Sequence, residues 1–298
     1  MSGPALTQLQ FDVDGQSFPI VLGTDAPRTL GALARYLPLP LQLHTPKIAG
    51  SHIYWHAPLI EDVEGETAVL DAPPGAFIYW PVRQFLEITF APLQAETASV
   101  TVLGHLDAPV DGIAALAGRL KREQGQRIFR GQLSAPGATT LASPAKTSLP
   151  PEIAAVSARV WQACPADLRE LTASRAIMHP AGPALLAESE LRVLHEVLWT
   201  LRASLGETPQ EMTRHTAALN INRAGGRLRD FCHLGESAEA LTMLGRCFER
   251  DNIALDTLID ESIRIIGRLS AWADLLIPWN DLNDAFRIAA TQMEKAEQ

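Results

Sequence analysis

The hydrophobic periodicity of the chain changes once along its length, and this change limits the folds that the chain can adopt. Between Leu9 and His105, apolar residues alternate with polar ones in short runs bounded by Gly and Pro, which is typical of β-strands. Beyond residue 150 the spacing becomes three and four, as in Leu191, Leu194 and Leu198, which is typical of amphipathic helices. The stretch 131–150 is rich in Gly, Ser, Thr, Ala and Pro, a composition typical of a linker. The sequence therefore predicts an α+β protein with a β domain at 1–130 and an all-α helical bundle at 151–298.

Length and composition agree with two folded domains and argue against several classes of protein. A chain of 298 residues exceeds the usual single core of about 100 to 200 residues. The formal net charge is -9 and no block of Lys or Arg stands out, which argues against a nucleic-acid or membrane surface as partner. No signal-peptide pattern and no run of about 18 apolar residues is present, so we expect a cytoplasmic protein. Cys164, Cys232 and Cys247 share no CxxC spacing, so we expect buried free thiols.

Several further elements follow from turn and capping signals. Asp14-Gly15 is a hairpin signal between two alternating runs, and the run from Thr24 to Tyr36 has helical spacing after a capping residue. The bundle should contain about five to seven helices. The remaining expected elements are a late strand at Val100–His105 and a short helix at Ala114–Glu123.

The segment from His44 to Phe90 contains an unusual strand. In the run His52–His56 successive residues point to opposite faces, which places His52, Tyr54 and His56 together on one face. Two imidazoles and a phenol would then share a small surface. A solvated polar strand face is an equally weighted alternative, because antiparallel sheets commonly expose one polar face.

Two further strands follow as a hairpin. The Pro-Pro-Gly turn at 73–75 and Pro81 delimit the strand Ala76–Trp80, since proline cannot continue a ladder. The next strand, Phe85–Phe90, contains Glu87 as its only acid. A carboxylate among apolar neighbours should face a pocket or a cation. An ion pair between Glu87 and Arg83 is a structural alternative of comparable weight.

Three runs, taken in order, carry a family resemblance. They are Asp-Ala-Pro-Arg-Thr-Leu at 25–30, Pro-Lys-Ile-Ala-Gly-Ser-His-Ile-Tyr-Trp at 46–55, and the Pro-Pro-Gly turn with Phe-Ile-Tyr-Trp-Pro at 77–81 and the strand ending at Phe90. Over about the first third of the chain they resemble bacterial cyclophilin-like proteins. The resemblance implies a cyclophilin-like closed β-barrel with a helix at its open ends. The prolyl-isomerase residues are not matched, so that activity is not expected.

A barrel followed by a helical bundle is also the arrangement of the cucumopine synthase family, which this chain resembles. That family joins histidine to 2-oxoglutarate by Pictet-Spengler cyclisation without a nucleotide cofactor. The resemblance implies a cofactor-independent enzyme that condenses an amino acid such as histidine with a 2-oxo acid. Two alternatives stay open: a non-catalytic small-molecule-binding or assembly protein, and a hydrolase.

The catalytic candidates follow from the strand pattern and not from the resemblance. Glu87 is favoured as the general base. His52, Tyr54 and His56 are candidates for proton transfer and for hydrogen bonding to a developing oxyanion. These groups suit proton-transfer chemistry on a carbonyl or imine carbon.

The candidates for substrate binding come from loops and neighbouring elements. Lys47 and Ser51 precede the histidine-bearing strand, and Arg28 opens the predicted N-terminal helix, so these side chains could bind a carboxylate. Each of them taken alone is more often a solvated residue. Tyr79 on the following strand and His105 at the end of the late strand complete the set.

Motifs for cofactors are absent from the sequence. The glycines form neither a GxGxxG nor a Walker pattern, so no nucleotide cofactor is expected. His-Glu-x-x-His is absent, and a strand separates His52 from His56 too widely for one metal ion, so no metal is expected. In the bundle, His195 and Trp199 should pack at the edge of the core. The bundle's leucine stripes exceed what one barrel face can cover, so we expect a homo-oligomer.

Overall fold

The structure is a computed structural model that describes residues 6–47, 50–94, 97–136, 149–173, 181–250 and 252–296. Two compact units divide the chain. The first contains Met1–Pro81, Phe85–Ser143 and Pro278–Gln298, and the second contains Val82–Gln84 and Pro144–Ile277. The last segment of the helical region predicted at 151–298, Pro278–Gln298, therefore belongs to the first unit. The short connection before Phe85 belongs to the second unit.

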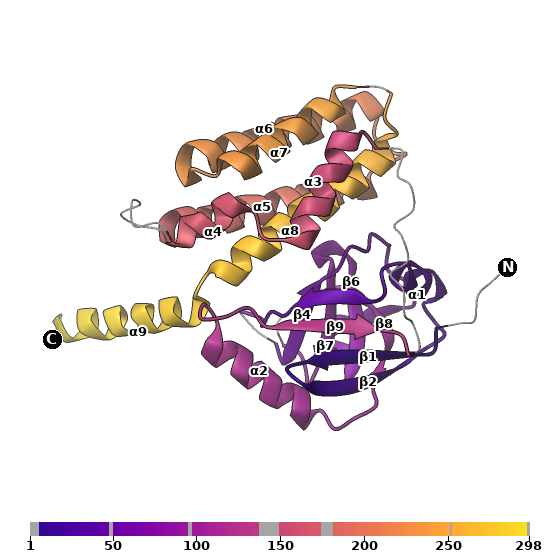
Figure 1. Ribbon diagram of the computed structural model, residues 1–298, viewed down its shortest axis with the longest axis vertical. Coiled ribbons are helices and arrows are strands. Elements are labelled where there is room, and N and C mark those ends of the chain that lie inside the picture. Colours follow the sequence, from indigo (N-terminus) through magenta and orange to yellow (C-terminus); the bar gives the residue numbers. More distant parts are fainter. Residues whose placement is uncertain are drawn as a thin grey trace. The chain divides into compact units, whose positions relative to one another are not determined.

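A nine-stranded antiparallel sheet forms most of the first unit in the described residues (Figure 1). Its strands follow one another in the order β3-β9-β1-β2-β8-β6-β7-β4, and β5 pairs with β8. The strands are β1 (Gln8–Val13), β2 (Gln16–Leu22), β3 (Leu39–Gln42), β4 (His52–His56), β5 (Glu66–Ala68), β6 (Ala76–Trp80), β7 (Phe85–Thr89), β8 (Ser99–Leu106) and β9 (Arg130–Ser134).

The two ends of this sheet meet just beyond β3. His44 and Tyr54 form an antiparallel bridge, in which His44 N donates to Tyr54 O (2.8 Å) and Tyr54 N donates to His44 O (3.2 Å). This bridge joins the end of β3 to β4 and nearly closes the barrel, because it occupies edge groups that an open sheet would leave unpaired. The predicted barrel is thereby confirmed.

Local sequence explains several of the elements of the barrel. Asp14 and Gly15 have φ values of 49° and 75°, the left-handed pair that a two-residue hairpin requires between β1 and β2. Helix α1 (Pro27–Ala34) begins with Pro at its first turn, later than the predicted start at Thr24. Helix α2 (Asp111–Glu123) confirms the short helix that was predicted from Ala114. Both helices contribute buried residues to the barrel core, among them Leu30, Leu33, Ile113 and Leu116.

The predicted linker has to be corrected at its start. Residues 131–134 belong to β9, which pairs with β1 and with β3. Their composition resembles a linker because β9 contains Gly131, Gln132 and Ser134, yet Leu133 is fully buried in the barrel core. The part of the predicted linker at 137–148 lies outside the described residues.

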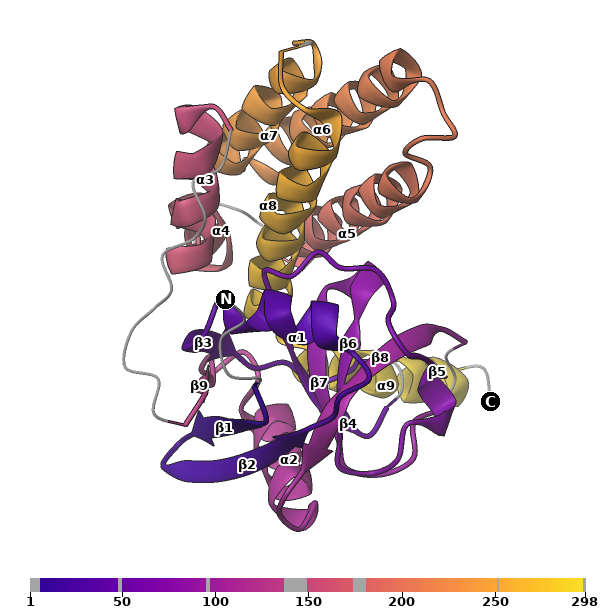
Figure 2. The ribbon, with the colours of Figure 1, turned by 90° about the vertical axis from the view of Figure 1, so that its right-hand side faces the viewer.

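Six helices make up the described part of the second unit (Figure 2). In this bundle α6 packs against α7, and α5 packs against both α6 and α8. Leu191, Leu194 and Leu198 of α5 are buried. The leucine stripe on which the oligomer prediction was based thus lies inside the unit, and that reasoning is wrong. The helices are α3 (Pro151–Gln162), α4 (Ala166–Ala173), α5 (Ala181–Ala203), α6 (Gln210–Cys232), α7 (Gly235–Phe248) and α8 (Leu255–Leu276).

One more helix, α9 (Trp279–Ala296), follows the bundle in sequence and belongs to the unit of the barrel. Asn280 at its start hydrogen-bonds with the backbone oxygen of Lys121 and with Gln124 Oε1 (3.3 Å) at the end of α2. Among the described residues, none of the helices combines the length and the apolar character that a membrane span requires.

Candidate functional site

The pairing of β4 with β7 brings four of the candidate residues together. Tyr54 lies directly opposite Glu87, and His52 and His56 lie opposite Thr89 and Phe85. Because facing residues in an antiparallel pair share a face, the three ring side chains and the carboxyl group form one cluster. The alternate residues of both strands belong to the barrel core. The cluster therefore occupies the outer face of the barrel wall.

Burial distinguishes this face from a solvated strand surface. Glu87 has no exposed area, and His52, Tyr54 and His56 are between 5% and 9% exposed. The same face continues on β6, where Ile78 lies opposite Glu87 and belongs to a second apolar cluster with Trp80. The alternative of an exposed polar face is therefore wrong for these residues.

Glu87 and His52 bring a carboxyl group and an imidazole close together in this cluster. Glu87 Oε2 lies 3.6 Å from His52 Nε2. Burial, and then the positive charge of Lys121, lower the pKa of His52 to about 4. At neutral pH the imidazole is therefore uncharged and can accept a proton. A buried carboxyl group beside a neutral imidazole is a suitable arrangement for proton transfer.

Tyr54 is held on both sides of its ring. Its ring stacks against His44 on one side and Phe85 on the other, with centroid distances of 4.9 Å and 4.3 Å. Lys47 Nζ donates a hydrogen bond to Tyr54 Oη (2.9 Å), and the same ammonium group lies 5.8 Å from the ring centroid of Trp279. A cation so close to the phenol stabilises negative charge near it. Of the predicted binding residues, Lys47 thus lies in the cluster.

Gly50 allows His52 to take its position. Its φ is +129°, which L side chains rarely adopt, and an added Cβ would lie 2.6 Å from both Cε1 and Nδ1 of His52. Ser51 lies between them, half-buried, and its backbone oxygen accepts a hydrogen bond from Phe90 N (2.7 Å). Ser51 therefore adjoins the cluster through the backbone, and its glycine neighbour sets the orientation of the imidazole.

The structure places the other three predicted binding residues elsewhere. Tyr79 points to the opposite face of the sheet, into the barrel core, where its hydroxyl donates to Leu59 O (3.0 Å). Arg28 is exposed on α1, and its Nε lies 3.4 Å from Glu64 Oε1. His105 is exposed near the end of β8, opposite Ala76. Strand alternation separates Tyr79 from Glu87, because Tyr79 pairs with the core residue Leu86. His105 shares the outer face with Ala76 but lies exposed at the end of its strand.

Sequence reasoning missed Gly50, His44 and Trp279 as neighbours of the cluster. A glycine before a predicted strand was a usable signal for Gly50. His44 joins the site through the bridge that closes the barrel, and Trp279 joins it through a helix far along the chain. No local pattern reveals such contacts.

Arg83, the alternative structural partner considered for Glu87, has another acidic neighbour in the structure. Its guanidinium forms an ion pair with Glu196 at 2.7 Å, within the second unit. The neighbouring residue Gln84 is fully buried and has a φ of 57°. Such a backbone conformation is uncommon for residues other than glycine, so the turn before β7 is held by its surroundings.

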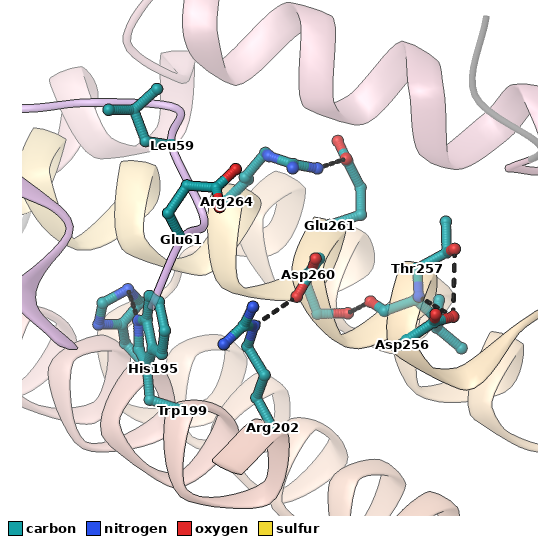
Figure 3. A network of polar contacts seen from close by, with 12 residues as sticks. Leu59, Glu61, His195, Trp199, Arg202, Asp256, Thr257, Asp260, Glu261 and Arg264 are labelled. Atoms are coloured by element: carbon teal, nitrogen blue, oxygen red, sulfur yellow. Dashed lines mark hydrogen bonds and ion pairs between the residues drawn. The ribbon is translucent and has the colours of Figure 1, made fainter. Parts of the chain in front are cut away.

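A second polar cluster lies within the bundle unit (Figure 3). His195 Nε2 accepts a hydrogen bond from Trp199 Nε1 (3.3 Å) and lies 3.1 Å from the side-chain amide oxygen of Gln84. Burial, and then the positive charges of Arg192 and Arg83, lower the pKa of His195 to about 3. The predicted packing of His195 and Trp199 at the core edge is confirmed, since both are buried.

The same cluster continues from α5 to α8. Arg202 Nε donates to Asp260 Oδ1 (2.8 Å), and the Arg202 guanidinium lies 5.2 Å from the centroid of the Trp199 ring (Figure 3). Burial raises the pKa of Asp260 despite the opposing effect of Arg202. These contacts tie two helices together. Within the part of the chain that the structure describes, no three His, Cys, Asp or Glu side chains are grouped so that they could hold a metal ion.

Comparison with known proteins identifies a related fold. No protein-family profile and no curated protein sequence matches the chain. The structure of McbB in complex with tryptophan is similar, with a TM-score of 0.70 and 16% identity over 93% of this chain and 99% of that chain. The hypothetical protein AF2241 from Archaeoglobus fulgidus overlaps more loosely, with a TM-score of 0.33 and 16% identity over 45% of this chain and 99% of its own. The chain thus shares with McbB an α+β fold that combines a nearly closed antiparallel barrel with a helical bundle.

Proposed function

We propose that this protein is a cofactor-independent enzyme that condenses an amino acid with a 2-oxo acid by Pictet-Spengler cyclisation. The observation that carries the proposal is the fully buried carboxyl group of Glu87, 3.6 Å from the neutral imidazole of His52. The tryptophan bound by McbB supports an amino acid as the ligand class. The opine-type substrates, with histidine as the amino acid, follow from the sequence resemblance.

The reaction can be written so that its atoms balance. The amine of the amino acid adds to the ketone of the 2-oxo acid, and loss of water gives an iminium ion. A carbon of the aromatic ring then attacks the iminium carbon, which forms the new carbon-carbon bond. A base removes the proton from that ring carbon and restores aromaticity. The sum of these steps consumes one amine and one ketone and releases one water, so it requires no oxidant or reductant.

Each residue of the cluster has a role in this sequence. Glu87 is the base that removes the ring proton, and His52 accepts or returns that proton over the 3.6 Å between them. The Tyr54 hydroxyl, held by Lys47 at 2.9 Å, donates to the oxygen that leaves as water. Lys47 also offers its ammonium group to a substrate carboxylate. His56 belongs to the cluster and Ser51 adjoins it, and both contribute to its surroundings.

The proposal is tested by product formation. The purified protein is incubated with histidine or tryptophan and with 2-oxoglutarate or pyruvate, and mass spectrometry looks for the sum of the two substrates minus one water. We expect one pair to give a product at a rate above the uncatalysed reaction. Absence of product with every pair, together with tight amino-acid binding by calorimetry, would instead favour the non-catalytic binding protein.

A further inference from the structure

Helix α9 presents large apolar side chains to solvent. Phe286 is 74% exposed and Met293 is 66% exposed. Figure 1 shows α9 extending from the end of α2, away from the barrel of its own unit. Most of the stability of a helix in a protein comes from packing of its apolar face, and most residues of this 18-residue helix are exposed. A partner that covers this helix would both shield the apolar area and stabilise the helix.

Four apolar residues of α9 form one continuous face, and the exposed Ile288 lies off it. Leu282, Phe286, Ala289 and Met293 are spaced four, three and four, which is the seam spacing of paired helices. Ala285 and Ala290 flank this seam and are small enough for a second helix to approach closely. By helical geometry all of the charged side chains lie on the other side: Asp281, Asp284, Arg287, Glu294 and Lys295. Pairing along the seam would bury no charge.

The seam is complementary to itself when a second copy runs in the opposite direction. A two-fold axis midway between residues 287 and 288 places Leu282 against Met293 of the other copy, and Phe286 against Ala289. A large side chain then faces a small one in the central layers, as dense packing requires. A parallel pair would instead set Phe286 against Phe286 and leave the Ala289 layer underpacked. Antiparallel helix dipoles also favour the first arrangement.

We propose that α9 is a dimerisation helix whose partner is the antiparallel α9 of a second copy of this chain. The same two-fold axis brings Ala296 of the second copy to Trp279, the residue whose ring contacts Lys47 in the candidate site. In the dimer, the end of the second copy's helix therefore lies beside Trp279, which adjoins the candidate site. The helix is about 27 Å long at 1.5 Å per residue, so α9 alone forms a small interface.

Light scattering after size-exclusion chromatography tests the proposal on the full chain. The chain mass is 32.3 kDa, so a dimer should give twice this value. The protein is loaded at about 0.1 mM, well above the micromolar Kd expected of a small interface. Phe286→Asp should give the mass of one chain, because it places a charge in the seam. The matched control Thr291→Glu adds a charge to the opposite side of the same helix and should stay dimeric.

Two results would overturn the proposal. One is a mass of 32.3 kDa for the unchanged protein. The other is a dimer that persists in the Phe286→Asp variant, since another surface would then hold it. Circular dichroism confirms that the variant is folded, which is expected because the Phe286 side chain is 74% exposed.

Disulfide cross-linking tests the direction of the pairing. The background is Cys164→Ser, since Cys232 and Cys247 are buried. A mixture of Leu282→Cys and Met293→Cys chains should cross-link on oxidation. Leu282→Cys alone should not, because the two cysteines would lie about 16 Å apart along the antiparallel pair, beyond disulfide reach. Efficient cross-linking of Leu282→Cys to itself would show a parallel pair and reject the antiparallel arrangement.

Discussion

At the scale of single residues, the candidate site depends on a few atoms whose positions are set by their neighbours. Glu87 is placed by its pairing with Tyr54, and His52 is placed by the glycine that precedes it by two residues. Because the pair is buried, a substitution can alter both activity and stability. Measuring turnover and melting temperature on the same variant separates the two effects.

Replacing Glu87 with Gln tests its role as base. Gln keeps the size and hydrogen-bonding capacity of the side chain but removes the proton acceptor, so turnover should fall by about 10² to 10⁴. The exposed residue Glu239 provides the matched control, and Glu239→Gln should leave turnover unchanged. Turnover and melting temperature are measured on the same preparations. A folded Glu87→Gln protein with full turnover would remove Glu87 from the mechanism, and a lower Tm with unchanged activity would indicate a structural role.

Replacing Gly50 with Ala tests the placement of His52. The new Cβ would lie 2.6 Å from the imidazole and would occupy an unfavourable backbone conformation, at φ +129°. We expect a loss of about 1 to 3 kcal/mol in unfolding free energy from the backbone and a clear fall in turnover from the displaced ring. Gly15→Ala is the control, because Gly15 also has positive φ but nothing within 4 Å of an added Cβ. Equal effects of the two variants on turnover would contradict the proposed role of Gly50.

At the scale of elements, the site combines adjacent strands with a helix far along the chain. The β4–β7 pair supplies Glu87 and His52, the groups that we propose react, and α9 supplies Trp279, whose ring centroid lies 5.8 Å from Lys47 Nζ. A cation beside an aromatic face is stabilised in position by about 0.5 to 2 kcal/mol. The start of α9 thereby helps to hold Lys47 next to Tyr54.

Replacing Trp279 with Ala should weaken substrate binding more than it slows the chemical step. Loss of the cation–aromatic contact with Lys47 should raise the KM for the amino acid by about 2-fold to 30-fold, with kcat nearly unchanged. Ile288→Ala is the control on the same helix, since Ile288 is 60% exposed and lies off the apolar seam. Steady-state kinetics measure both parameters. An unchanged KM, or a fall confined to kcat, would argue against a positioning role for Trp279.

At the scale of the whole molecule, buried neutral histidines couple stability to pH. The pKa values of His52 and His195 are lowered to about 4 and about 3. As the pH falls below about 6.5, the unfolded chain binds protons on these side chains while the folded protein does not. Unfolding free energy should therefore decrease with acidification, by about 1.4 kcal/mol per pH unit for each histidine, between pH 6.5 and pH 4. Below pH 4 only His195 continues to contribute.

Urea unfolding between pH 7 and pH 5 measures this slope, above the range in which most carboxylates titrate. His195→Gln should reduce the dependence of unfolding free energy on pH by about 1.4 kcal/mol per pH unit, the contribution of one histidine. His215→Gln changes an exposed histidine and should leave the slope as it is. A stability that does not change between pH 6.5 and pH 5 would show that these histidines are not buried in the neutral form.

The sequence by itself determined the secondary-structure classes, because hydrophobic period and turn residues act locally. It predicted the two-part α+β fold, the strands His52–His56 and Phe85–Phe90, and the grouping of His52, Tyr54 and His56, since strand alternation follows from backbone geometry alone. The end of the barrel was missed because the composition of β9 is that of a linker, and only its pairing with β1 and β3 makes it a strand.

Only the tertiary structure decided which sheet face is the core and which residues from distant segments meet. Tyr79 and Glu87 both lie in strands, yet the barrel buries Tyr79 inside and leaves Glu87 on the outer face with His52. Trp279 reaches Lys47 only because the start of α9 lies beside the barrel. The physical reason is that the face on which a side chain lies, the strand register and the long-range contacts all depend on how the whole sheet closes. Closure involves strands that are far apart in the sequence, so no short segment predicts it.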